Sequence, residues 1–119
     1  MLVIRKEQME ALSAYMRRNF EDRMVEHIAA DFPEQFERMK EEGTREFVRA
    51  GVARCAAHGI DTEGGIRFVV DLLLEHPDFD GSRDMAWART ILQDGELSGQ
   101  GKVNLIQQRL EAAKARRKA

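Results

Sequence analysis

The sequence predicts an all-α protein, a compact bundle of about five to six helices in a single domain spanning residues 1–119. Apolar residues recur at steps of three and four along most of the chain, which is the spacing of an amphipathic helix. The 119 residues include only 2 prolines, and β-branched runs are few, so a sheet is disfavoured. A chain of this length with 43% apolar residues can bury a core without disulfides.

The first helix is expected over residues 5–31. Its apolar residues form one stripe at helical spacing, opposite a charged face. The stripe consists of Met9, Leu12, Met16, Phe20, Met24 and Ile28. Pro33 disfavours the α conformation at Phe32, so the helix should end there.

Two shorter helices are expected next, at residues 33–41 and 44–58. Pro33 suits the first position of a helix because it has no backbone N–H to leave unpaired. Gly43 should separate the two helices, and Thr44 should cap the N-terminus of the second.

The middle of the chain contains the most apolar helix. Gly51 should allow another helix to approach closely, and Gly59 should take the left-handed conformation that ends a helix. Asp61 or Thr62 then caps a helix that ends by Pro77. Its apolar residues are Ile66, Phe68, Val69, Val70, Leu72, Leu73 and Leu74. A helix that is apolar nearly all round should be central.

A turn-rich loop over residues 78–82 precedes the next helix. Ser82 or Asp84 should start that helix, and Asp94-Gly95 marks the turn that follows it. Asp78, Asp80 and Ser82 are expected to bond backbone amides in the loop, as side chains of these types do in turns.

The last helix is expected to begin near Val103, after a stretch that Gly99 and Gly101 should keep flexible. Residues 102–119 hold six of the 19 lysines and arginines but a single acid, Glu111. This basic C-terminal helix lacks large apolar residues at its end, where it should fray.

The basic helix on an acidic body has two interpretations. It could bind nucleic acid or an acidic partner. Alternatively, it is a solvated helix whose cations lie near its negative C-terminal dipole. Nucleic acid is disfavoured, because the formal net charge is −2 and no aromatic residue is interleaved among the charges for base stacking.

Two segments superficially match ligand-binding loops. Residues 99–102 lack the glycine of a phosphate loop, where Glu96 stands, and its hydroxyl residue, where Val103 stands. Residues 78–84 have alternating acids, but their glycine falls at the wrong position for calcium, and Arg89 replaces the final glutamate of such a loop.

No catalytic, cofactor-binding or metal-ligating residues are predicted. His27, His58 and His76 with Cys55 match no zinc spacing, and no nucleophile–base pair is evident. Cys55 lies on an apolar stripe, where a buried inert thiol is usual. The sequence therefore predicts a protein that is not an enzyme and needs no cofactor.

The single cysteine fits a reducing compartment, so a cytoplasmic location is expected. The first residues have no apolar segment typical of a signal peptide, and no apolar run is long enough for a membrane span. We therefore expect no membrane association.

Aromatic and methionine side chains are the remaining candidates for a binding surface. Phe79 and Trp87 flank a loop and the start of a helix. Their rings either lie at the edge of the core or anchor an interface with a partner. Four of the six methionines lie in the first 24 residues. Methionine adapts to varied partners, but core filling is the favoured interpretation of these residues, Met16 among them.

Several short strings resemble a family of small bacterial proteins encoded beside type VI secretion genes. The strings are Ile4-Arg5-Lys6-Glu7-Gln8-Met9, Phe20-Glu21-Asp22-x-Met24-Val25-x-His27, Gly51-Val52-Ala53-Arg54, Gly59 with Gly65-x-Arg67-Phe68, Leu72-Leu73-Leu74, Asp78-Phe79-Asp80 and Trp87-Ala88-x-x-Ile91-Leu92. They span about three-quarters of the chain, and the C-terminal third matches least.

The resemblance implies a co-chaperone or adaptor that helps to load an effector or a PAAR spike-tip protein. Its partner would be the effector, the effector's chaperone or the spike-tip protein. The expected contact residues are Phe79, Asp80 and Trp87, with the exposed side of the first helix. Two alternatives stay open, an immunity protein that neutralises a secreted effector and a nucleic-acid-binding regulator that uses the basic helix. A homodimer through the first helix also stays open.

Overall fold

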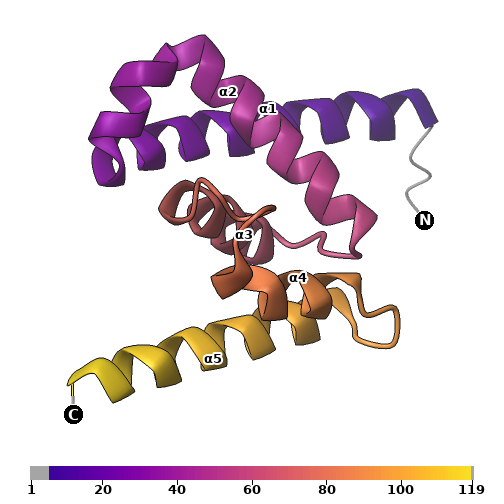
Figure 1. Cartoon of the computed structure of the whole chain (residues 1–119). Helices are drawn as coiled ribbons and strands as arrows, with labels where there is room; N and C mark the ends of the chain where they lie inside the picture. Colours follow the sequence, from indigo (N-terminus) through magenta and orange to yellow (C-terminus); the bar gives the residue numbers. More distant parts are fainter. Residues whose placement is uncertain (1–5, 119) are drawn as a thin grey trace. The chain divides into compact units, whose positions relative to one another are not determined.

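The computed structural model describes residues 6–118, and the side chains of residues 14–116. All secondary-structure elements of the described residues are helices (Figure 1), which confirms the all-α prediction of about five to six helices. The elements are α1 (Lys6–Asp31), α2 (Pro33–Ala57), α3 (Glu63–Glu75), the 3₁₀ helix η1 (Arg83–Met85), α4 (Ala86–Gln93) and α5 (Gly99–Lys118). Two compact units, residues 1–49 and 50–119, are described separately below. That residues 1–119 form a single domain stays a prediction.

In the first unit, α1 ends at Asp31 and Phe32 is not helical, as the following proline predicts. The C-terminal half of the expected apolar stripe is core, since Phe20, Met24 and Ile28 are buried, whereas Met16 is 55% exposed. The side chains of Met9 and Leu12 lie outside the described residues.

The predicted break between two helices is present in α2, but its position differs from the prediction. The range Pro33–Ala57 holds two helical stretches joined across a kink, and the non-helical residue is Lys40, with φ 63° and ψ −179°, rather than Gly43. Thr44 is therefore inside a helix and not its N-cap. Its hydroxyl is fully buried and has no hydrogen-bond partner among the described residues. The usual acceptor, the carbonyl four residues earlier, belongs to the irregular Lys40.

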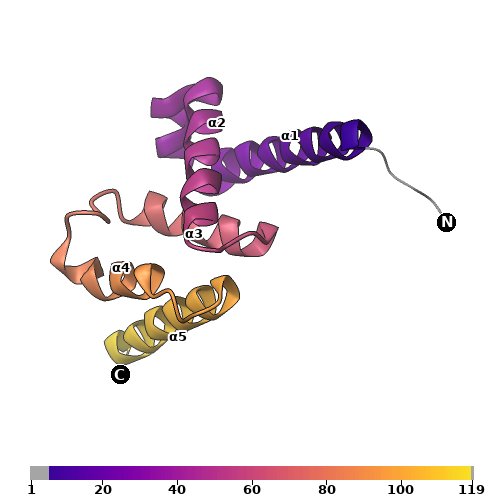
Figure 2. The same ribbon diagram turned by 90° about the vertical axis from the view of Figure 1, so that its right-hand side faces the viewer.

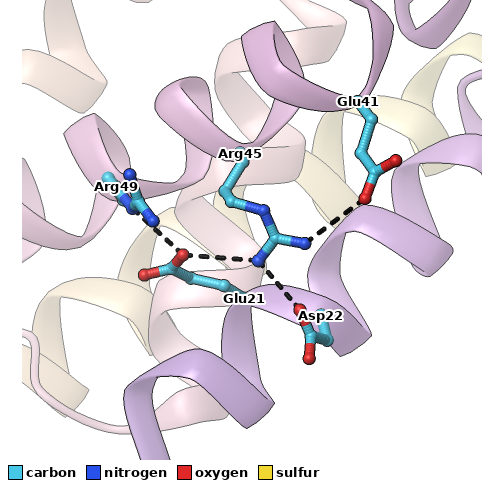
Figure 3. A network of polar contacts seen from close by, with 5 residues as sticks. All are labelled: Glu21, Asp22, Glu41, Arg45 and Arg49. Atoms are coloured by element: carbon cyan, nitrogen blue, oxygen red, sulfur yellow. Dashed lines mark hydrogen bonds and ion pairs between the residues drawn. The ribbon is translucent and has the colours of Figure 1, made fainter. Parts of the chain in front are cut away.

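An ion-pair network joins α1 to the first part of α2 (Figure 3). The Arg45 guanidinium lies 2.8 Å from Asp22, 3.5 Å from Glu21 and 3.6 Å from Glu41. Arg49 donates to Glu21 at 3.0 Å. These bonds, together with the acidic side chains beside it, hold the pKa of Arg45 above its usual value, so its charge is retained.

In the second unit, the end of α2 packs closely against α3. A Cβ added to Gly51 would lie 2.7 Å from Val70 Cγ2, which confirms the predicted close approach. Gly59 has φ +77° and closes α2 in the left-handed conformation, also as predicted. Thr62 caps α3, because its hydroxyl accepts a hydrogen bond from the Gly65 amide at 3.0 Å.

Helix α3 is buried on most sides but not on all. The apolar run of this helix predicted that Leu73 and Phe68 lie in the core. Both side chains are only partly buried. The buried residues of α3 are Gly65, Ile66, Val69, Val70, Leu72 and Leu74. The helix is thus the apolar centre of its unit, with one partly exposed edge.

Helix α5 begins earlier than predicted, and Gly99 is not part of a flexible stretch. A Cβ on Gly99 would collide with the Gly59 backbone, so this glycine allows the start of α5 to pack against the end of α2. Ser98 caps α5 by accepting from the Gly101 amide at 3.0 Å. Helix α5 then packs along α3 and α4 (Figures 1 and 2) and continues to Lys118. Residue 119, at the end expected to fray, lies outside the described residues.

Candidate partner-binding surfaces

The most exposed apolar side chains lie on α1, in the first unit. Tyr15 is 68% exposed and Met16 is 55% exposed, and they are the large apolar side chains that stand out from the described surface. All six residues of 14–19 are exposed, and six residues cover every side of a helix. Figure 2 shows the N-terminal half of α1 extending past the residues 33–49 of α2.

The side chains of residues 14–19 are therefore not covered by the rest of their unit. An isolated helix of such length is marginal in water, since most helix stability in proteins comes from packing of an apolar face. A tyrosine and a methionine left in water on such a helix are a typical feature of a surface that binds a partner.

The structure places Phe79 in the core rather than at a binding surface. It is 2% exposed, and the Arg54 guanidinium lies 5.3 Å from the centre of its ring. Arg89 donates to the carbonyl oxygens of Phe79, at 2.6 Å, and Ser82, at 2.7 Å. Two arginines, one from α2 and one from α4, therefore hold the loop, and the Phe79 ring is covered.

Asp80 is exposed but already has a partner. Both of its carboxylate oxygens accept from Arg54, at 3.0 and 2.5 Å. This bidentate pair lowers the pKa of Asp80 and raises that of Arg54. Asp80 thus helps to fix the loop, and a ligand would have to share its carboxylate with Arg54.

Trp87 lies on α4 at the edge of the core. It is half-buried, and the Arg109 guanidinium of α5 lies 5.7 Å from its ring centre. Of the three predicted contact residues, Trp87 is the one whose partly exposed ring could anchor a partner. That role remains a prediction.

Cys55 and His58 are near each other on one helical turn, yet the pair is not arranged for catalysis. Burial raises the pKa of the Cys55 thiol to about 11, so the thiolate needed for nucleophilic attack is scarce at neutral pH. Burial also lowers the pKa of His58, aided by the positive charges of Lys102 and Arg54. Both groups are therefore neutral at physiological pH.

The other loop candidates have structural partners of their own. Lys102 is 5% exposed, and its Nζ donates to the His58 carbonyl oxygen at 2.9 Å, where it caps the end of α2. In the loop after α3, the carboxylate of Asp80 is paired with Arg54, and Ser82 accepts from the Asp84 amide at 3.1 Å. These side chains stabilise turns and helix ends.

Within the described part of the chain, no group of three or more histidine, cysteine, aspartate or glutamate side chains is arranged to hold a metal ion. No helix among residues 6–118 is both long and apolar enough to cross a membrane. Comparison with protein-family models, curated proteins and solved structures gave no match.

Sequence reasoning did not single out Tyr15. A tyrosine beside a methionine stripe is typical of the border of a buried face, and only the exposure of residues 14–19 in the structure reveals the surface. Arg54 and Arg89 were also missed as the residues that hold the loop at 78–82. Their positive charge opposite a turn rich in aspartate was the available signal.

Proposed function

We propose that this protein is a non-enzymatic adaptor or co-chaperone of a type VI secretion system. Its partner would be an effector, the effector's chaperone or a PAAR spike-tip protein, bound in the cytoplasm. The resemblance of its sequence strings to proteins encoded beside such genes supports this partner class. The observation that carries a binding role is the exposed turn at 14–19 of α1, with Tyr15 and Met16 in water.

The mechanism is burial of apolar surface. A helix that projects from its own unit can lie in a groove of the partner, where it gains the packing that it lacks alone. Tyrosine suits this role, because it offers a large rigid ring at a low entropy cost and a hydroxyl that can stay hydrogen-bonded. Binding would also order the α1 segment, since a marginal helix gains stability when one face is covered.

The test is binding of the purified protein to the effector, chaperone and PAAR protein encoded nearest to it. The double variant Tyr15→Ser/Met16→Ser should bind its partner at least about tenfold more weakly than the wild type, because exposed anchors of this size dominate small interfaces. Isothermal calorimetry measures the change in Kd.

The matched control is Ala14→Ser/Asn19→Ser, which introduces the same two serines on the same exposed turn of α1. It lowers helix propensity similarly but leaves the apolar side chains in place. If the control weakens binding as much as the double variant does, helix stability and not the exposed surface is responsible. If no partner of the three classes binds the wild type, the proposed function is wrong. Protection of cells that express the effector would instead identify an immunity protein.

A further inference from the structure

Helix α5 has a positively charged end that extends beyond the helices covering it. Figure 1 shows its C-terminal half running past α4. Arg109, Lys114 and Arg116 are all exposed there, and the one acidic residue nearby is Glu111. The charge is therefore concentrated on a single helical segment, 109–116.

These positive charges are not used inside the second unit. Among the side chains described for residues 14–116, neither Lys114 nor Arg116 pairs with a carboxylate. By contrast, Arg54 is bonded to Asp80, and Arg89 is bonded to two backbone carbonyls. The segment 109–116 thus presents several positive charges close together on one stretch of helix.

An aromatic ring lies beside this charge. The Arg109 guanidinium is 5.7 Å from the ring centre of Trp87, a contact that orients the cation before any partner arrives. Arg116 follows seven residues after Arg109, so the two lie on the same face of α5. Tryptophan and arginine are the residue types most enriched among those that dominate binding energy.

We propose that the surface formed by Trp87, Arg109 and Arg116 binds an acidic helical segment of a protein partner. Carboxylates at helical spacing would pair with the two arginines, which share one face of α5, while Lys114, farther round the helix, adds to the positive field. An apolar side chain of the partner would cover the exposed part of the Trp87 ring. This inference rests on the proposed function and names the chemistry of one partner segment. A long polyanion such as DNA fits less well, because residues 50–98 hold nine acids and four basic residues that would repel it.

The probe is a synthetic amphipathic helix with glutamates on one face and leucines on the other. Trp87 is the one tryptophan of the chain, so its fluorescence reports on this surface directly. The glutamate peptide should shift the Trp87 emission with an affinity that falls as salt rises. The variant Arg109→Gln/Lys114→Gln/Arg116→Gln should bind it roughly tenfold more weakly.

The matched control, Arg38→Gln/Lys40→Gln/Arg83→Gln, removes two arginines and one lysine from exposed positions elsewhere. It should bind the peptide like the wild type. Equal weakening by both triple variants would show attraction by overall charge and overturn the proposal. Absence of any Trp87 response to the glutamate peptide would also overturn it, as would tighter binding of a DNA duplex through the same three residues.

Failure here and failure of the proposed function can be told apart. If the secretion partner binds normally to the α5 triple variant but weakly to the Tyr15→Ser/Met16→Ser variant, this inference is wrong and the proposed function stands. If both variants bind the glutamate peptide and secretion partners as the wild type does, both proposals are wrong.

Discussion

At the scale of single residues, replacing either of two helical glycines with alanine should change the free energy of unfolding, in opposite directions at the two positions. A Cβ on Gly51 would lie 2.7 Å from Val70 Cγ2, whereas a Cβ on Gly64 in α3 meets nothing within 4 Å. Gly51→Ala should therefore lower the free energy of unfolding by about 1–3 kcal/mol through overpacking. Gly64→Ala should raise it by about 0.5–1 kcal/mol, since alanine is the better helix former. Urea unfolding measures both, and stabilisation by Gly51→Ala would show that the two helices are not so close.

His58 should make stability depend on pH. Burial, with the charges of Lys102 and Arg54, lowers its pKa in the folded state, so protonation favours the unfolded chain. The stabilisation is complete above the unfolded-state pKa of about 6.5 and is lost as the pH falls below it, towards the folded-state pKa. His58→Gln should flatten the decline of unfolding free energy just below this pH, while keeping the backbone carbonyl that Lys102 bonds. Parallel pH profiles for the two proteins would contradict the assignment.

At the scale of elements, Lys40 is the strained residue of α2. Its φ of 63° with ψ −179° is a conformation that essentially only glycine adopts without cost, and such strain is about 1–3 kcal/mol. Lys40→Gly should raise the free energy of unfolding by about 1 kcal/mol, after allowance for glycine's entropy in the unfolded chain. Lys40→Ala keeps the Cβ and should change little. Thermal unfolding of the two variants compares them directly, and destabilisation by Lys40→Gly would mean that α2 is regular at this position.

Helix positions were largely predictable from local signals. Pro33, Gly59 and Thr62 each act within one helical turn, and their effects appear where the sequence predicts them. The irregular residue of α2 was not predictable, because a lysine takes this conformation only under tertiary constraint. Gly99 was misjudged for a related reason: its role comes from Gly59, distant in sequence, and propensity alone describes a glycine as flexible.

At the scale of the whole molecule, the candidate surfaces were also only partly predictable from local sequence signals. Residue types at helical spacing predicted which residues are apolar, but not which apolar residues receive a packing partner. Phe79 was expected at a surface and is buried, whereas Met16 was expected in the core and is exposed. Whether an apolar side chain is buried depends on how far along its length each helix is covered by the rest of its unit. The periodicity of apolar residues within one helix does not contain that information.

The chain as a whole separates its charge. Its net charge is −2, yet the exposed end of α5 is positive. A protein of this kind can be repelled from nucleic acid overall while one helix attracts an acidic protein segment. The apolar turn of α1 belongs to the first unit and the basic end of α5 to the second, and the variants described above address each of them by itself.

The central claim, that this protein binds a type VI secretion partner, is tested most directly by affinity purification of the tagged chain from its native host, with mass spectrometry of the proteins retained. The account predicts recovery of an effector, its chaperone or a PAAR protein, and loss of that protein from the Tyr15→Ser/Met16→Ser variant. Recovery of the chain alone, or of nucleic acid in place of a secretion protein, would contradict it.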